Sequence, residues 1–328
     1  MGGTEKENGA ASRAVDPSAG QFDVAVVGGG PAGLSASIWL ARYLHRVVLV
    51  DSGDPRNWET RGVNGFLGHP DIRPSVLRGM GRDEARENGV ELVDAVCERV
   101  THADTERFEL ALADGTVIEA RRLLLAIGFK DVWPDVPGLG SVYGSDAHVC
   151  PDCDGPECID KKVVVIGSGR KAVGMALNLT TWTRDIIICT NGEPANFDRA
   201  EYCDKLDALN IPVIEFPIKC VDHSGSHVHA ISFESGMALD TDKIFFAIGQ
   251  YPADDLGAEL GCERDADGHI VVDDSNHTSV RNCFAAGDIT PGPQLAIAAA
   301  AEGAIAALAI HKSLVPDARK LEKQELAG

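Results

Sequence analysis

Two cysteines separated by two residues are the part of this sequence best suited to chemistry. The segment reads Cys150-Pro151-Asp152-Cys153-Asp154-Gly155. A proline between the cysteines limits backbone freedom and favours closure of a small disulfide ring. Asp154 directly follows the second cysteine, where a carboxyl group could donate or accept the proton that thiol–disulfide exchange requires. The segment therefore predicts a redox-active disulfide, with Cys150, Cys153 and Asp154 as catalytic residues.

The cysteine usage of the whole chain leaves one alternative for this segment. The chain has nine cysteines, and its first 20 residues lack the apolar stretch of a secretory signal. This indicates a reducing, cytoplasmic setting, in which a CxxC pair is usually catalytic or metal-binding. A zinc site of His148, Cys150, Cys153 and Cys158 is the alternative, but four ligands so close together would form a very tight loop, and we predict no metal. The remaining cysteines are expected in the core, at Cys97, Cys189, Cys203, Cys220, Cys262 and Cys283.

A glycine-rich turn near the N-terminus predicts a dinucleotide site. The apolar run 23–27 is followed by Gly28-Gly29-Gly30-Pro31-Ala32-Gly33 and then by a helical pattern over residues 34–43. The glycines allow a tight turn, close approach of the backbone to a pyrophosphate and close packing of helix on strand, while the helix N-terminus supplies N–H groups. A second apolar run, 47–50, ends at Asp51, where a carboxylate can bind an adenosine ribose.

The same pattern recurs 139 residues later. The apolar run 162–166 precedes Gly167-Ser168-Gly169-Arg170-Lys171-Ala172 and a helix that extends to about Thr180. In this second turn, Gly167, Gly169, Arg170 and Lys171 are candidates for binding a nicotinamide dinucleotide. Strands and helices thus alternate in two dinucleotide folds, and the CxxC immediately precedes the second, which predicts an α/β protein.

The bulk composition agrees with two globular domains. The chain has 328 residues, of which 44% are hydrophobic and 24% charged. Its formal charge of −20 argues against nucleic-acid binding, because contacts to phosphates require a surplus of Lys and Arg. The Ala-rich segment 295–310 is interrupted by Glu302 and Gly303 and is too short to span a bilayer. We therefore expect it to be a buried helix of a soluble protein, with no membrane partner.

Taken in order along the chain, these motifs resemble the low-molecular-weight thioredoxin reductases. The matching motifs are the first glycine turn, Ala126-Ile127-Gly128, the CxxC, the second glycine turn, Ala247-Ile248-Gly249, Cys283-Phe284-Ala285-Ala286-Gly287-Asp288 and Pro293-Gln294-Leu295-Ala296. The resemblance extends from Val24 to about His311, and its specificity comes from the combination, not from any one motif. It implies a homodimer of chains with two Rossmann-like three-layer domains, the second inserted into the first. The implied parts are an FAD-binding domain (21–131 plus 248–315), an NAD(P)-binding-like domain with the CxxC (132–247), a disordered tail (1–20) and a polar tail (316–328).

The resemblance also implies roles for individual residues. Cys153 would lie against the flavin, Cys150 would attack the disulfide of a thioredoxin-like or other dithiol protein, and Asp154 would serve as the acid. Arg56 is expected at the adenosine end of FAD, and Asp288 near its ribityl and pyrophosphate groups. The full set expected to bind FAD is Gly28, Gly30, Pro31, Ala32, Gly33, Asp51, Ser52, Arg56, Asn64, Ala126, Gly128, Gly287, Asp288, Gln294, Leu295 and Ala296.

The sequence departs from the family at the second nucleotide site. In place of the family's arginine-rich clamp for the 2′-phosphate of NADPH, the strand 185–189 is followed by Thr190-Asn191-Gly192-Glu193-Pro194. An acidic domain repels a 2′-phosphate unless guanidinium groups hold it. Arg199 could partly substitute, and Glu193 could instead hold the free 2′-hydroxyl of NADH.

Several functions therefore stay open. The electron donor can be NADPH, NADH, ferredoxin or a dithiol. The chain can be a disulfide reductase, a dithiol oxidase that passes electrons to oxygen, or a flavoprotein redox sensor. Cys158 stands where the family has an aromatic residue, and it is either a third redox thiol or a spectator.

Overall fold

The computed structural model describes residues 21–57, 60–195 and 200–321. The chain divides into two compact units: unit 1 takes in Met1–Pro55, Arg78–Gly128 and Pro252–Gly328, and unit 2 takes in Arg56–Leu77 and Phe129–Tyr251. Both contain a parallel sheet with helices, and the predicted α/β fold class is confirmed. The expected tail 1–20, the end of the expected tail 316–328 and the candidate Arg199 lie outside the described residues.

Unit 1 is built on a seven-stranded sheet. Its neighbours run in the order β3-β2-β1-β6-β5-β4, with β17 also paired to β6. The pairs among β1, β2, β3, β6 and β17 are parallel, and β4, β5 and β6 pair antiparallel. β1 and β2 are almost wholly buried, as expected for parallel strands covered on both faces. The strands are β1 (Phe22–Val27), β2 (Val47–Asp51), β3 (Glu91–Asp94), β4 (Cys97–His102), β5 (Phe108–Leu112), β6 (Val117–Leu125) and β17 (Cys283–Ala285).

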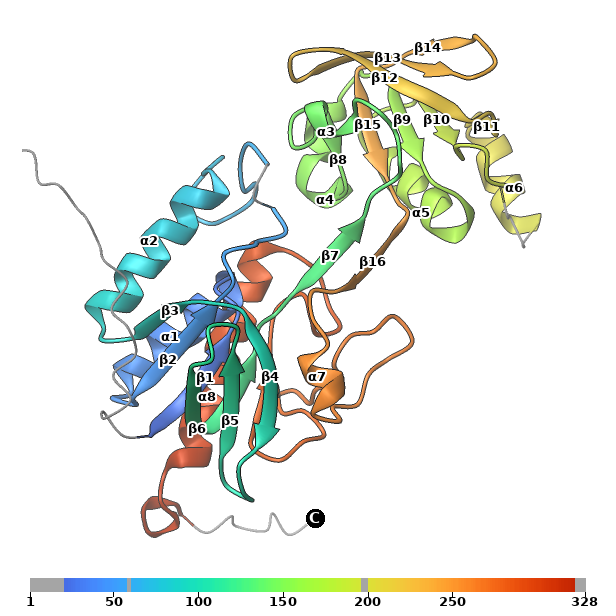
Figure 1. The fold of residues 1–328 in the computed structure, drawn as a ribbon. Coiled ribbons are helices and arrows are strands. Elements are labelled where there is room, and N and C mark those ends of the chain that lie inside the picture. The colour runs from blue at the N-terminus through green and yellow to red at the C-terminus, as the bar shows by residue number, and fades with distance from the viewer. Residues whose placement is uncertain (1–20, 58–59, 196–199, 322–328) are drawn as a thin grey trace, which may run out of the picture. The chain divides into compact units, whose positions relative to one another are not determined.

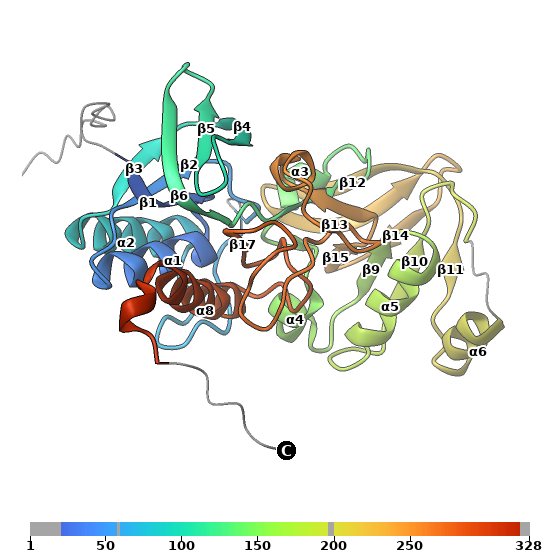
Figure 2. The same ribbon diagram turned by 90° about the horizontal axis from the view of Figure 1, so that it is seen from below.

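Two helices pack side by side against this sheet, α1 (Pro31–Arg42) and α8 (Ala296–Leu314) (Figure 2). They approach closely because Gly303 of α8 lies against the backbone of Ala32, where a Cβ would overlap the Ala32 carbonyl oxygen. Leu40 of α1 shares one apolar core with Val24 of β1 and Ile310 of α8. The other helices are α2 (Pro74–Glu87), α7 (Leu256–Glu259) and the 3-10 helix η2 (Asp317–Arg319).

The Ala-rich helix α8 is buried on one side only. Ala306 and Ile310 are fully buried, whereas Ile297, Ile305 and Leu308 are 37–47% exposed. By length and composition alone, α8 is the one helix among the described residues that could cross a membrane. A single such helix is weak evidence, because core helices of soluble proteins meet the same test.

Unit 2 is built on a five-stranded parallel sheet in the order β11-β10-β9-β15-β8. Figure 1 shows the strands and helices of this unit. Alternate residues of β9 belong to two separate apolar clusters. Val164 and Ile166 pack with residues of the three-stranded antiparallel sheet β12-β13-β14, and Val163 and Val165 pack with residues of α5 and α6. Because β-strand side chains alternate between faces, these continuous apolar runs require cover on both sides.

The strands of unit 2 are β7 (Phe129–Val132), β8 (Ala147–His148), β9 (Val163–Ile166), β10 (Ile186–Cys189), β11 (Val213–Ile214), β12 (Ile218–Ser224), β13 (His227–Phe233), β14 (Ala238–Asp240), β15 (Lys243–Phe246) and β16 (Gly249–Pro252). Its helices are α3 (Leu139–Val142), α4 (Pro151–Asp154), the 3-10 helix η1 (Gly155–Cys158), α5 (Gly169–Leu179) and α6 (Ala200–Ala208). β7 and β16 form a separate two-stranded sheet.

Candidate functional site

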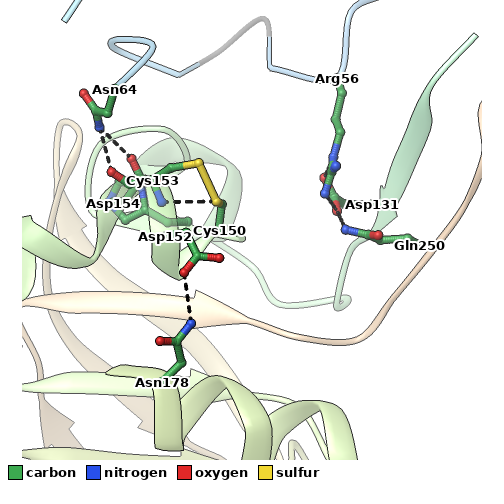
Figure 3. The surroundings of a disulfide bond; sticks show 10 residues. Arg56, Asn64, Asp131, Cys150, Asp152, Cys153, Asp154, Asn178 and Gln250 are labelled. Carbon is green, nitrogen blue, oxygen red and sulfur yellow. Dashed lines mark hydrogen bonds and ion pairs between the residues drawn. A yellow bond between two sulfur atoms is a disulfide. The ribbon is translucent and has the colours of Figure 1, made fainter. Parts of the chain in front are cut away.

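Cys150 and Cys153 form a disulfide at the start of α4, with their Cα atoms 5.4 Å apart (Figure 3). Cys150 is the N-cap of α4 and has an extended backbone conformation. Pro151 is the first residue of the helix, a position whose backbone N–H has no partner within the helix, so the N–H that proline lacks is not missed. The Cys150 Sγ accepts a hydrogen bond from the Cys153 N–H at 3.2 Å. Once the disulfide is reduced, this amide stabilises negative charge on Cys150, in keeping with its expected role as the attacking sulfur.

Asp154 has two polar neighbours, one from a distant part of the sequence and one from the strand just before it. The Asn64 Nδ2 donates to Asp154 Oδ1 at 3.3 Å and to the Cys153 carbonyl oxygen at 3.0 Å (Figure 3). The His148 Nδ1 lies 3.3 Å from Asp154 Oδ2. Asn64, which the sequence analysis assigned to FAD, therefore contacts the CxxC segment in this structure. The contact of His148 with Asp154 was not predicted, because the sequence suggested His148 only as a zinc ligand.

The third cysteine of the segment is placed as a spectator. Cys158 is fully buried in η1, and burial raises the pKa of its thiol to about 12. A thiol so seldom ionised is a poor nucleophile. Cys150 and Cys153 are joined to each other, and among the described residues no three His, Cys, Asp or Glu side chains are grouped as metal ligands.

A buried lysine anchors the segment that carries the disulfide. The Lys243 Nζ of β15 lies 2.6 Å from Glu157 of η1 and 3.0 Å from Asp146, and it donates to the Ser145 carbonyl oxygen at 2.9 Å. Burial by itself would lower the pKa of Lys243, but its bonds to Glu157 and Asp146 raise it above the ordinary value. The CxxC segment is therefore fixed to the sheet at its far end.

The first glycine turn fits a bound dinucleotide. A Cβ at Gly33 would overlap the Gly28 carbonyl oxygen, and one at Gly29 would overlap the Asp51 carboxylate, so the turn closes tightly around both glycines. A Cβ at Gly30 would meet nothing within 4 Å, and no side chain caps α1. The start of α1 thus offers an open, uncapped helix N-terminus of the kind that binds phosphates.

The other predicted FAD residues of unit 1 gather at the same edge of its sheet. β1, β2, β6 and β17 run parallel, so the residues that follow their carboxyl ends lie along one edge, where nucleotides bind in open α/β sheets. Those residues are Gly28, Gly30, Pro31, Ala32 and Gly33 after β1, Asp51 and Ser52 at the end of β2, Ala126 and Gly128 after β6, and Gly287 and Asp288 after β17. Gln294, Leu295 and Ala296 lead into α8, with Leu295 as its N-cap.

Two arginines of α2 were missed as part of this edge. Arg78 and Arg82 both bind the Asp51 carboxylate, Arg82 through its Nη1 at 2.8 Å. Arg78 also donates to the Gly29 carbonyl oxygen at 3.3 Å. They lie four residues apart on one helix face, a spacing that could have suggested a common carboxylate partner.

Arg56 is engaged within unit 2. Its guanidinium binds the Asp131 carboxylate with two hydrogen bonds, 2.8 Å from Nε and 2.6 Å from Nη2 (Figure 3). The Gln250 Nε2 donates to the same carboxylate at 3.1 Å. Arg56 and Asn64 belong to the segment 56–77, which groups with unit 2, whereas the sequence analysis assigned it to the FAD-binding domain.

The second glycine turn is closed by the chain itself. The Gly169 N–H, at the start of α5, donates to the Ala195 carbonyl oxygen at 2.9 Å, and the Ala195 N–H donates to the Glu215 carboxylate at 2.9 Å. β10 ends at Cys189 and is followed by Thr190, so no carboxylate stands where Asp51 stands in the first turn. Arg170 and Lys171 are exposed, and so is Glu193. The sequence predicted neither the hydrogen bond between Gly169 and Ala195 nor the contact of Glu215 with Ala195.

The geometry therefore separates the two turns. The first offers an uncapped helix N-terminus with a paired carboxylate beside it, and its residues fit FAD. At the second, a carbonyl oxygen and a carboxylate stand at the helix N-terminus, and both repel phosphate oxygens. A pyrophosphate bound at the second turn would have to displace the Ala195 carbonyl oxygen from the Gly169 N–H.

The chain is similar to known proteins over most of its length. Residues 22–303 match the family model described as pyridine nucleotide-disulphide oxidoreductase. Among solved structures, a Bacillus anthracis protein assigned as a thioredoxin reductase is 31% identical with a TM-score of 0.82, covering 89% of this chain and 98% of its own. HlmI is 33% identical with a TM-score of 0.85, covering 90% of this chain and 93% of its own.

A curated relative is longer. This relative, one of the subunits of the alkyl hydroperoxide reductase of Escherichia coli, is 29% identical over 306 residues, which are 90% of this chain and 58% of the relative. The chain thus spans little more than half the length of the curated relatives that it matches.

Proposed function

The chain belongs to the pyridine nucleotide-disulphide oxidoreductase family, and we propose that within this family it reduces the disulfide of a thioredoxin-like protein. It is a flavoprotein disulfide oxidoreductase with FAD as cofactor. One observation carries the proposal: the Cys150–Cys153 disulfide lies at a helix start beside a positioned carboxyl group. The relatives assigned as thioredoxin reductases support a thioredoxin-like partner.

The side chains of the CxxC segment can perform the exchange with the partner. The Cys150 thiolate attacks one sulfur of the partner's disulfide, and the departing partner sulfur takes a proton from Asp154. Asp154 then takes the proton of the Cys153 thiol, whose sulfur attacks Cys150 and breaks the mixed disulfide. The second partner sulfur leaves as a thiolate and takes that proton from Asp154. The dithiol is thereby oxidised to the disulfide while the partner is reduced by two electrons. When bound, FAD supplies the two-electron chemistry that restores the dithiol.

The closed second turn favours a donor other than NADPH. A bound dinucleotide would have to displace the Ala195 carbonyl oxygen from the Gly169 N–H and lie near the Glu215 carboxylate. The same observation favours a second candidate function, a dithiol oxidase, in which a small dithiol reduces the CxxC disulfide and oxygen accepts the electrons.

An anaerobic titration separates the candidates. The purified yellow protein is mixed in turn with NADPH, NADH, reduced ferredoxin and dithiothreitol while the flavin absorbance is followed. We expect slow bleaching by NADPH and rapid bleaching by another donor. Bleaching by the dithiol alone, with peroxide formed in air, would assign the oxidase. Rapid bleaching by NADPH would restore a nicotinamide-dependent reductase, and a colourless protein would contradict every flavin-dependent function.

We further infer a homodimer in a reducing compartment. The exposed side of α8 carries Ile297, Ile305 and Leu308, and the neighbouring α1 exposes Trp39. A second copy covering these side chains would remove apolar surface from water. Light scattering tests this: we expect the mass of two chains for the wild type and of one chain for Leu308→Glu, and a monomeric wild type would contradict it.

A further inference from the structure

The imidazole of His148 is buried, and among the residues that the structure describes its one polar neighbour is Asp154. His148 lies on β8, its ring centroid 5.4 Å from that of Phe245 on the neighbouring β15. Its Nδ1 is 3.3 Å from Asp154 Oδ2, while its Nε2 is buried without a hydrogen-bond partner. No step of the disulfide exchange described above uses this ring.

The unpartnered nitrogen determines where the proton of the ring resides. A buried N–H without an acceptor costs more than a buried lone pair without a donor, because the donor loses a strong bond to water. The proton is therefore disfavoured at Nε2, both in the neutral ring and in the imidazolium. This places a ring proton on Nδ1, which lies 3.3 Å from Asp154 Oδ2.

We propose that His148 is a positioning residue for proton transfer at the CxxC, holding the Asp154 carboxylate through its Nδ1–H. This inference deepens the proposed function and rests on it. Asn64 donates to Oδ1, and the His148 Nδ1 lies 3.3 Å from Oδ2, so each oxygen of Asp154 faces a nitrogen whose place is fixed by the fold. The His148 proton itself does not leave the ring. It stabilises the carboxylate formed each time Asp154 gives its proton to a departing sulfur, and it keeps that carboxylate aimed at the Cys153 thiol for the return step.

The charged side chains near His148 and Asp154 are paired with other residues. Lys243 of β15 is bound by Glu157 of η1 and by Asp146, which precedes β8. Asp152 of α4 accepts a hydrogen bond from Asn178 of α5 at 3.2 Å. None of these bonds involves the imidazole, so the His148–Asp154 contact can be altered without removing them.

Two substitutions distinguish positioning from packing. His148→Phe fills the space of the imidazole ring but removes its N–H, whereas His148→Gln retains a side-chain N–H. The CxxC of each holoprotein is reduced under anaerobic conditions, and the rate of its oxidation by glutathione disulfide is measured by stopped flow from pH 5 to 9. We expect His148→Phe to lower the rate near pH 7 about tenfold, as the loss of a positioned proton-transfer group would. His148→Gln should recover most of the rate.

The outcomes separate this inference from the proposed function. A wild type whose reduced CxxC does not react with the disulfide would overturn the proposed function. A reactive wild type whose rate and pH profile are unchanged in His148→Phe would overturn the role of His148. An equal loss of rate in His148→Phe and His148→Gln would overturn it too, because it would indicate that His148 acts only through its packing. If His148→Phe does not fold, nitrogen NMR of histidine-labelled wild type decides: a neutral His148 with its proton on Nδ1 supports the proposal, and a proton on Nε2 contradicts it.

Discussion

The two glycine turns follow the same order of strand, turn and helix, but differ at the helix N-terminus. At the first, Gly30 is the N-cap of α1 and has open space where a Cβ would lie, and the nearby Asp51 is bound by two arginines. At the second, α5 begins with the Gly169 N–H already donated to Ala195. A shared fingerprint therefore does not establish shared binding. The groups that surround the turn decide which anion it can accept.

The largest expected effect is on FAD binding, when one methyl group is added to the first glycine turn. The same change in the second turn is the control. In Gly33→Ala the new Cβ overlaps the Gly28 carbonyl oxygen. We expect FAD binding to weaken about 100-fold, equivalent to about 3 kcal/mol of overpacking. The matched control is Gly167→Ala, whose Cβ would lie 2.8 Å from the Ala247 carbonyl oxygen in unit 2. It should destabilise unit 2 yet retain the flavin, as measured by flavin absorbance per chain. Equal flavin loss in both variants would contradict the division of roles.

A smaller effect is expected from the carboxylate of the first turn. Asp51→Asn removes the charge that Arg78 and Arg82 share. Charge-assisted hydrogen bonds contribute about 1.5–3 kcal/mol, so we expect FAD to bind about tenfold more weakly in equilibrium titrations. Asp94→Asn is the control, because Asp94 also binds Arg82 but its side chain is 57% exposed. If Asp94→Asn weakened FAD as much as Asp51→Asn, the pairing at Asp51 would have no special role.

The second turn should respond in the opposite direction to loss of a charge. Glu215→Gln removes the carboxylate that accepts from the Ala195 N–H. With one negative charge fewer, we expect the Kd for NADPH, measured by calorimetry, to fall severalfold. Glu193→Gln is the control, since it removes the same charge from an exposed residue of the same segment. Tight NADPH binding by the wild type would contradict the contrast between the turns.

The smallest effect concerns pH and distinguishes the two units. Burial raises the pKa of Asp254 in unit 1 to about 6. Stability from the protonated carboxyl is present below pH 4 and is lost as the pH rises through 6. In unit 2, burial by itself would raise the pKa of Asp146, but Lys243 holds this pKa below the ordinary value. The stability that ionised Asp146 contributes is therefore lost only as the pH falls below about 4.

Hydrogen exchange resolved by segment can follow this difference. On raising the pH from 4 to 6, stability corrected for intrinsic exchange should fall in unit 1 of the wild type but not in Asp254→Asn. Unit 2 should show no such fall in either protein. A fall in unit 1 that persists in Asp254→Asn would assign it to another group.

Much of the fold could be predicted because its signals are local. The buried runs 23–27, 47–50 and 162–166 correspond to β1, β2 and β9, and their glycine turns begin α1 and α5. The helix of the Ala-rich segment was also predicted, although one of its sides is exposed. The prediction that six further cysteines lie in the core was wrong for Cys203, which is exposed on the polar helix α6, and for Cys220, which is only half-buried on β12.

The contacts that define the site could not be predicted, because they join distant segments. His148 is fixed by the pairing of β8 with β15, nearly 100 residues later in the chain. Asn64 reaches the CxxC from a segment without regular periodicity. The closure of the second turn depends on the backbone of Ala195, whose carbonyl oxygen every residue type shares. Residue types identified the candidates, and only the fold shows their partners.

The number of electrons that the protein accepts tests most directly whether FAD and the Cys150–Cys153 disulfide exchange electrons. Anaerobic dithionite titration of the wild type should consume four electrons per chain, two for FAD and two for the Cys150–Cys153 disulfide. Cys150→Ser, which keeps the fold but has no disulfide, should consume two. A wild type that accepts only two electrons would show that the disulfide does not exchange electrons with the flavin, and it would contradict the central claim.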